Sequence, residues 1–101
     1  MAKGYWIAHV DVTDPEAYKS YVAANAAAFA RFGARFLVRA GRGEIKEGAA
    51  RARHVVIEFK DYATALACYD SPEYRRAAAL RETASVCDLA VVEGYDGPRP
   101  G

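Results

Sequence analysis

Near its beginning the sequence reads Tyr5-Trp6-Ile7-Ala8-His9-Val10-Asp11-Val12, and both alternating sets of side chains in this stretch contain apolar groups. Successive side chains of a β-strand point to opposite faces of its sheet. Trp6, Ala8 and Val10 would therefore lie on one face, and Ile7 and its neighbours on the other. We predict a strand that is covered on both faces. Three further apolar segments are predicted to be strands of the same kind, at Arg35–Ala40, His54–Lys60 and Val86–Tyr95.

Helices are predicted between these strands. The run Thr13-Asp14-Pro15-Glu16 has capping residues and a first-turn proline, so we expect a helix that runs to about Phe32 and ends at Gly33. A second helical arm begins at Asp61. Serine and proline restart it at residues 71–72, which predicts two pieces of about Tyr62–Tyr69 and Pro72–Thr83.

The predicted order strand, helix, strand, strand, helix, strand is that of a ferredoxin-like α+β fold with a four-stranded antiparallel sheet. We expect one domain over residues 1–96 and a loose tail over residues 97–101. The glycine-rich, charged run at 41–52 is predicted to be a hairpin loop. These helices suffice for one face of the sheet, so we expect the other face to meet a second copy, as a homodimer joined through its sheet faces.

Composition argues against several classes of partner. Lys and Arg total 14 against 13 Asp and Glu, so the net charge of +1 offers no electrostatic footprint for nucleic acid. No apolar run approaches the roughly 20 residues of a membrane span, and the first residues do not read as a leader, so we expect a cytoplasmic protein without a membrane partner. Cys68 and Cys87 form neither a disulfide framework nor a metal motif. We expect no cofactor and no metal.

Six motifs follow one another along the chain. They are Gly4-Tyr5-Trp6-Ile7, Val10-Asp11-Val12-Thr13-Asp14-Pro15-Glu16-Ala17-Tyr18, Gly33-Ala34-Arg35-Phe36-Leu37-Val38-Arg39, His54-Val55-Val56-Ile57-Glu58-Phe59, Cys68-Tyr69-Asp70-Ser71-Pro72-Glu73-Tyr74 and Val92-Glu93-Gly94-Tyr95-Asp96-Gly97. Over essentially the whole chain they resemble the family known as domain of unknown function 1330. The match departs at Ala40, where a glycine is expected.

The resemblance implies a dimeric α/β barrel, in which two ferredoxin-like subunits stack their sheets face to face. The family has no assigned biochemical role. Relatives in the wider superfamily include cofactor-free monooxygenases, isomerases and lyases. Because a fold does not carry a function with it, the resemblance implies only where to look for a pocket, between the helices and the sheet.

Two residues are candidates for acid–base catalysis. His9 lies within an apolar strand, and neighbouring strands would bring Glu58 within reach of His9 or of Arg39. A carboxylate beside an imidazole is suited to proton transfer. The alternatives are a core or interface histidine with one hydrogen bond, and an ion pair of Glu58 across the dimer seam. His54 is expected to be an ordinary residue at the rim of the sheet.

Arginines and tyrosines are the candidates for ligand binding. Arg81 shares a helix face with Tyr74 and Ala77, so we predict that it points inward, where its planar guanidinium suits a carboxylate. The alternative is a side chain that binds Glu58 or a helix end. The set that would hold a ligand comprises Arg39 and Arg81 with Tyr21, Tyr69 and Tyr74, although such tyrosines are also ordinary packing residues.

Two functions of different class remain open at this point. The first is a dimer that binds a small anionic, partly aromatic metabolite in a pocket between helices and sheet. The second is a cofactor-free enzyme of the monooxygenase, isomerase or lyase type, in which His9 and Glu58 move protons and Arg39 or Arg81 holds the substrate.

Overall fold

The structure is a computed structural model that describes residues 2–98 and residue 100. Its elements are β1 (Gly4–Val12), α1 (Pro15–Phe32), β2 (Arg35–Arg39), β3 (Arg53–Phe59), α2 (Tyr62–Asp70), α3 (Pro72–Ala84) and β4 (Ser85–Glu93). The predicted α+β order is confirmed, and the last strand ends two residues earlier than expected. Of the domain and tail predicted from the sequence, residues 1, 99 and 101 lie outside the described residues.

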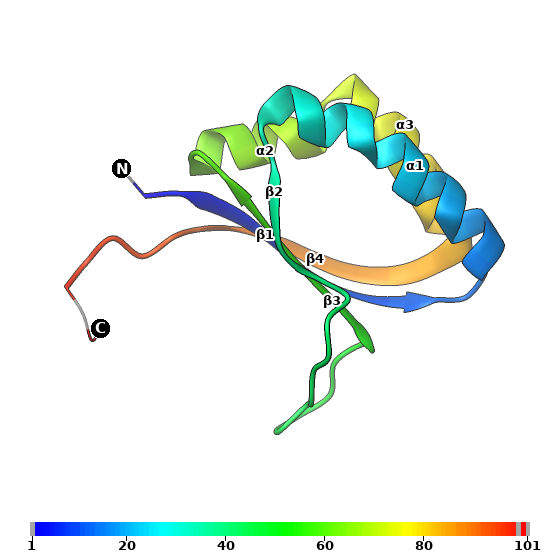
Figure 1. Ribbon diagram of the computed structural model, residues 1–101, viewed down its shortest axis with the longest axis horizontal. Helices are drawn as coiled ribbons and strands as arrows, with labels where there is room; N and C mark the ends of the chain where they lie inside the picture. Colours follow the sequence, from blue (N-terminus) through cyan, green and yellow to red (C-terminus); the bar gives the residue numbers. More distant parts are fainter. Residues whose placement is uncertain (1, 99, 101) are drawn as a thin grey trace.

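The four strands form one antiparallel sheet in the order β2-β3-β1-β4. In Figure 1 the helices α1, α2 and α3 lie together on one side of this sheet, and the β2–β3 connection extends away from them. The other side of the sheet carries no helix among the described residues. This ferredoxin-like arrangement confirms that the helices of the chain cover a single face.

Local signals set the helix ends. The Asp14 side chain accepts a hydrogen bond from a first-turn amide of α1, and Gly33 ends that helix with a φ of 66°. Between α2 and α3, the Ser71 hydroxyl accepts from the Tyr74 amide at 3.2 Å and donates to the Cys68 carbonyl at 2.7 Å. The predicted break of the second helical arm is therefore confirmed, because one buried serine caps both helices.

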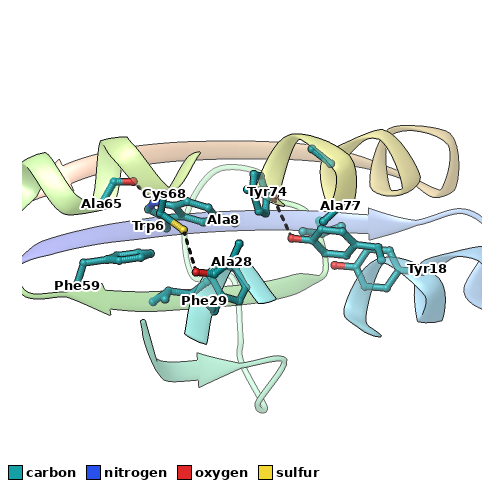
Figure 2. Close-up of a cluster of buried hydrophobic side chains, with 14 of the residues drawn as sticks. Trp6, Ala8, Tyr18, Ala28, Phe29, Phe59, Ala65, Cys68, Tyr74 and Ala77 are labelled. Carbon is teal, nitrogen blue, oxygen red and sulfur yellow. Dashed lines mark hydrogen bonds between the residues drawn. The ribbon is translucent and has the colours of Figure 1, made fainter. Parts of the chain in front are cut away.

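Trp6 lies at the centre of the core between helices and sheet (Figure 2). Its side chain is 1% exposed, and its ring meets Phe29 and Tyr74 edge-on at centroid distances of 5.4 and 4.8 Å. The indole N–H donates to the Ala65 carbonyl of α2 at 2.8 Å. This one residue of β1 therefore holds all three helices to the sheet.

Strand β2 contains an irregularity that changes the direction of one candidate residue. Arg35 pairs with Glu58, and strict alternation would place Arg39 on the same face. The register shifts at Leu37, however, and Arg39 pairs with Val55 on the face that the helices cover. The expectation that Glu58 reaches Arg39 is therefore wrong, because the extra residue in β2 puts the two side chains on opposite faces.

Ala40, where the resemblance leads one to expect glycine, has a φ of 58°. A Cβ atom makes this left-handed conformation unfavourable by roughly 1–2 kcal/mol. We expect Ala40→Gly to raise the free energy of unfolding by about 1 kcal/mol in urea denaturation, after the extra freedom that glycine gives the unfolded chain is subtracted. Ala49→Gly is the control, because Ala49 is exposed in the same connection without a positive φ. Equal destabilisation by both substitutions would contradict this account.

Candidate functional site

The side of the sheet opposite the helices is called the open face below. The register places these side chains on it: Tyr5, Ile7, His9 and Asp11 of β1, Arg35 and Val38 of β2, His54, Val56 and Glu58 of β3, and Val86, Asp88, Ala90 and Val92 of β4. Ile7 and Val86 are 37% and 47% exposed. The open face thus combines exposed apolar side chains with both histidines of the chain.

His9 lies on the open face against His54. The two Nδ1 atoms are 2.9 Å apart, and the rings cross at 80°. Asp88 of β4 is the register partner of His9 on its other side. The expectation of a rim residue at position 54 is therefore incomplete, since antiparallel pairing of β1 with β3 makes His54 the direct neighbour of His9.

Glu58 lies elsewhere on the same face. Its carboxylate accepts a hydrogen bond from the Tyr5 hydroxyl at 3.0 Å, and Tyr5 is its register partner. The Ile7–Val56 pair separates this contact from the histidines. The expectation that Glu58 reaches His9 is wrong, because the register of β1 with β3 pairs Glu58 with Tyr5 and His9 with His54. The spacing of residues along either strand does not reveal this register. An acid–base role for either residue stays a prediction.

The helix-covered side of the sheet contains a small cavity between α1 and strands β2 and β3, called the α1 cavity below. Its volume is about 30 Å³, room for about one water molecule. Most of its wall is aromatic or aliphatic, and the polar groups come from asparagine, tyrosine and arginine. The lining residues are Tyr18, Tyr21, Asn25, Phe29, Phe36, Arg39, Arg53, Val55 and Ile57.

Two arginines line the α1 cavity without a carboxylate partner among the described residues. Arg53 has a buried Nε atom that lacks a hydrogen-bond partner within the described part of the chain, and its guanidinium lies 5.3 Å from the Tyr18 ring centroid. Arg39 lies 4.0 Å over the Phe36 ring. A buried donor without a partner is costly, so the cavity favours a ligand with an acceptor oxygen.

Sequence reasoning singled out Arg39 and missed Arg53. A signal for Arg53 was present, since it alternates with Val55, Ile57 and Phe59 along β3 and so must share their face. For Arg39 the side of the sheet was not predictable by alternation, because of the irregularity at Leu37.

Arg81 points inward, as predicted, and is 9% exposed. It lies beside Tyr74, whose hydroxyl is 2.9 Å from the Tyr21 hydroxyl. Burial raises the pKa of both tyrosines, and for Tyr74 the hydrogen bond with Tyr21 and the charge of Arg81 offset part of that rise. Arg81 is not among the residues that line the α1 cavity, whereas Tyr21 is. Its alternative partner, Glu58, lies across the sheet on the open face.

Tyr69 lies apart from the α1 cavity. Its ring meets Trp6 edge-on at 5.7 Å, and the Arg75 guanidinium lies 4.2 Å from its centroid. The Arg75 side chain also donates to the Tyr69 carbonyl at 2.9 Å. These contacts are those of a packing residue, and its predicted role in ligand binding stays a prediction.

Other groups offer little chemistry. Burial raises the pKa of the Cys68 thiol to about 12, so this cysteine is an inert core residue. In the described part of the chain, no three His, Cys, Asp or Glu side chains gather where they can hold a metal ion. Among the described helices, none has the length and apolar character needed to cross a membrane.

The sequence profile of the DUF1330 family, a domain of unknown function, matches residues 3–95. The chain belongs to this family. No curated protein matches this DUF1330 chain significantly. The resemblance to this family is therefore confirmed, and the family has no assigned activity.

Several solved structures share the fold of this DUF1330 protein. A protein of unknown function from Rhodopseudomonas palustris has a TM-score of 0.72 and 18% identity over 98% of this chain and 85% of its own. SnoaB, a cofactor-independent oxygenase from Streptomyces nogalater, has a TM-score of 0.66 and 17% identity over 100% of both chains. A dimeric ferredoxin-like protein of unknown function from Thermobifida fusca has a TM-score of 0.53 and 17% identity, with coverage of 91% and 89%. Identities this low show the fold alone.

Proposed function

We propose that this DUF1330 protein is a homodimer, joined through its open face, that binds a small anionic aromatic metabolite at the α1 cavity. The observation that carries the binding function is the pair Arg39 and Arg53, two guanidinium groups without a carboxylate partner among the described residues, at a cavity with aromatic walls. The open face of the sheet supports the dimer, and the helix-covered face supports the binding of a ligand.

The dimer is supported by the apolar part of the open face. Ile7 of β1 pairs with Val56 of β3 and Ala90 of β4 across the centre of the sheet, and Val38 of β2, which pairs with Val56, extends this apolar area. An exposed apolar patch of this kind marks an interaction site. The similar Thermobifida fusca protein is described as dimeric. A second copy of the chain, laid sheet to sheet, would cover this face.

The ligand class is supported by the groups around the α1 cavity. A planar guanidinium binds a carboxylate with two parallel hydrogen bonds, and the buried Nε of Arg53 would gain its missing acceptor. The rings of Tyr18, Phe29 and Phe36 offer stacking surfaces to an aromatic ring. Binding sites usually enclose about 300–1,000 Å³. A ring therefore enters the 30 Å³ cavity only when an outer side chain moves, and exposed Arg39 is the one free to do so.

A cofactor-free enzyme is the second candidate function, because SnoaB, which shares the fold, is a cofactor-independent oxygenase. The geometry supports it less well. His9 and Glu58 lie on the open face, across the sheet from Arg39, and the two are separated by the Ile7–Val56 pair. A substrate held by Arg39 would be out of their reach within one chain.

Calorimetric titration with 4-hydroxybenzoate tests the binding function. Losing one charge-assisted hydrogen bond costs about 1.5–3 kcal/mol, so we expect Arg53→Gln to weaken binding roughly 10- to 100-fold. The neutral analogue 4-hydroxybenzamide should bind equally to both forms. Arg76→Gln is the matched control, because Arg76 is an exposed arginine on α3 that does not line the cavity. Equal affinity of Arg53→Gln and wild type, or no binding of either compound, would refute the anion site.

A further inference from the structure

A short polar contact on the open face joins the two histidines of the chain, His9 and His54. We propose that this pair makes the dimer acid-sensitive: the subunits associate while the two rings share one hydrogen bond, and they separate when both rings are protonated. The inference rests on the proposed dimer, because the two rings lose their contact with water only when the open face is buried between two sheets.

The contact itself sets the limit on protonation. Two Nδ1 atoms 2.9 Å apart form a hydrogen bond only if one ring donates and the other accepts. A fully protonated imidazole has two donors and no acceptor. When both rings carry a proton on Nδ1, the hydrogen bond is lost and two positive charges face each other. In a single chain water can solvate the two charged rings, whereas in the dimer they would stay desolvated.

The surroundings of His54 restrict its movement. Gly43 of the β2–β3 connection lies against the ring, since a Cβ atom at this position would come within 3.1 Å of the ring carbon Cδ2. The Ala40 amide donates to the His54 carbonyl at 2.9 Å. Two charged residues flank Gly43 in the sequence, Arg42 before it and Glu44 after it. The ring therefore has little room on the β2 side.

Around His9 the charges come from β1, β4 and the end of the β2–β3 connection. Arg51 donates to Asp11 at 2.9 Å and to Asp88 at 3.1 Å, which joins both carboxylates near His9 to one cation. The Ala52 amide and Arg51 hold the pKa of Asp11 below its ordinary value, so that carboxylate stays ionised at mildly acidic pH. Arg51 therefore occupies both carboxylates, and no described residue places a further carboxylate in hydrogen-bond contact with either histidine ring.

The small number of histidines allows the pH dependence of dimer dissociation to be assigned to particular side chains. Histidine is the side chain whose charge ordinarily changes between pH 5 and 8, and this chain has two of them. If each subunit takes up one more proton as the dimer separates, two protons are bound per dimer. Linkage then predicts that the dissociation constant rises by up to about 100-fold for each unit by which the pH falls. The remaining carboxylate of the open face, Glu58, serves as an independent check.

The experiment is sedimentation equilibrium between pH 7.5 and 5.0, with far-UV circular dichroism to show that the chain stays folded. For wild type we expect the dimer dissociation constant to rise at least about tenfold between pH 7.0 and 5.5. His54→Asn and His9→Asn should remove most of this pH dependence, whatever their affinity at pH 7.5. Glu58→Gln should leave it unchanged.

The outcomes separate the two proposals. A folded wild-type chain that is monomeric at pH 7.5 would overturn both the dimer and its acid sensitivity. A dimer whose dissociation constant is constant from pH 7.0 to 5.5, or rises equally in His54→Asn and wild type, would overturn only the role of the histidine pair.

Discussion

Replacement of Ile7 with lysine is expected to turn the dimer into a folded monomer. Ile7 lies at the middle of the open face, between Val56 and Ala90, and is 37% exposed in the single chain. In a sheet-to-sheet dimer its side chain would be desolvated. Burying an unpaired ammonium costs several kcal/mol, and a twofold interface contains the substitution twice. We therefore expect the dissociation constant to rise at least about 1,000-fold.

The measurement is light scattering coupled to size-exclusion chromatography at micromolar protein concentration. Leu80→Lys is a matched control, because Leu80 is an apolar residue of similar exposure, 42%, on helix α3. It should leave the dimer intact, and both variants should keep the circular dichroism of the folded chain. A dimeric Ile7→Lys variant, or a wild-type chain that elutes as a monomer, would exclude the open face as the interface.

Loss of the Trp6 side chain is expected to remove most of the stability of the chain. Removal of a buried tryptophan down to alanine costs about 3–5 kcal/mol, and the hydrogen bond to the Ala65 carbonyl adds about 1 kcal/mol. Domains are stable by only about 5–15 kcal/mol. Trp6→Ala should therefore unfold at a much lower urea concentration. Circular dichroism is the suitable probe, because Trp6 is the only tryptophan of the chain.

Trp6→Phe separates the two contributions. Phenylalanine keeps an aromatic ring against Phe29 and Tyr74 but cannot donate to Ala65. We expect it to cost less than half as much as Trp6→Ala. If both substitutions lowered stability by less than about 1 kcal/mol, the core would not depend on this residue, and the central place of Trp6 would be refuted.

Features that depend on neighbouring residues followed from the sequence. Alternation along β1 placed Trp6 and Ile7 on opposite faces, and capping residues located the helix starts at Asp14 and Ser71. The inward direction of Arg81 followed from helical spacing with Tyr74. Each of these features is local, because side-chain direction and helix termini are set by the backbone of a few consecutive residues.

Features that depend on the alignment of distant segments required the tertiary structure. The irregularity at Leu37 turned Arg39 toward the helices, and pairing of β1 with β3 joined His9 to His54 while it separated His9 from Glu58. These strands are more than 40 residues apart in sequence. A shift of one residue in register would reverse which side chains meet, and that register is chosen by packing over the whole sheet. The sequence alone therefore determined the fold and the two faces, whereas the tertiary structure decided which residues form the α1 cavity and the histidine pair.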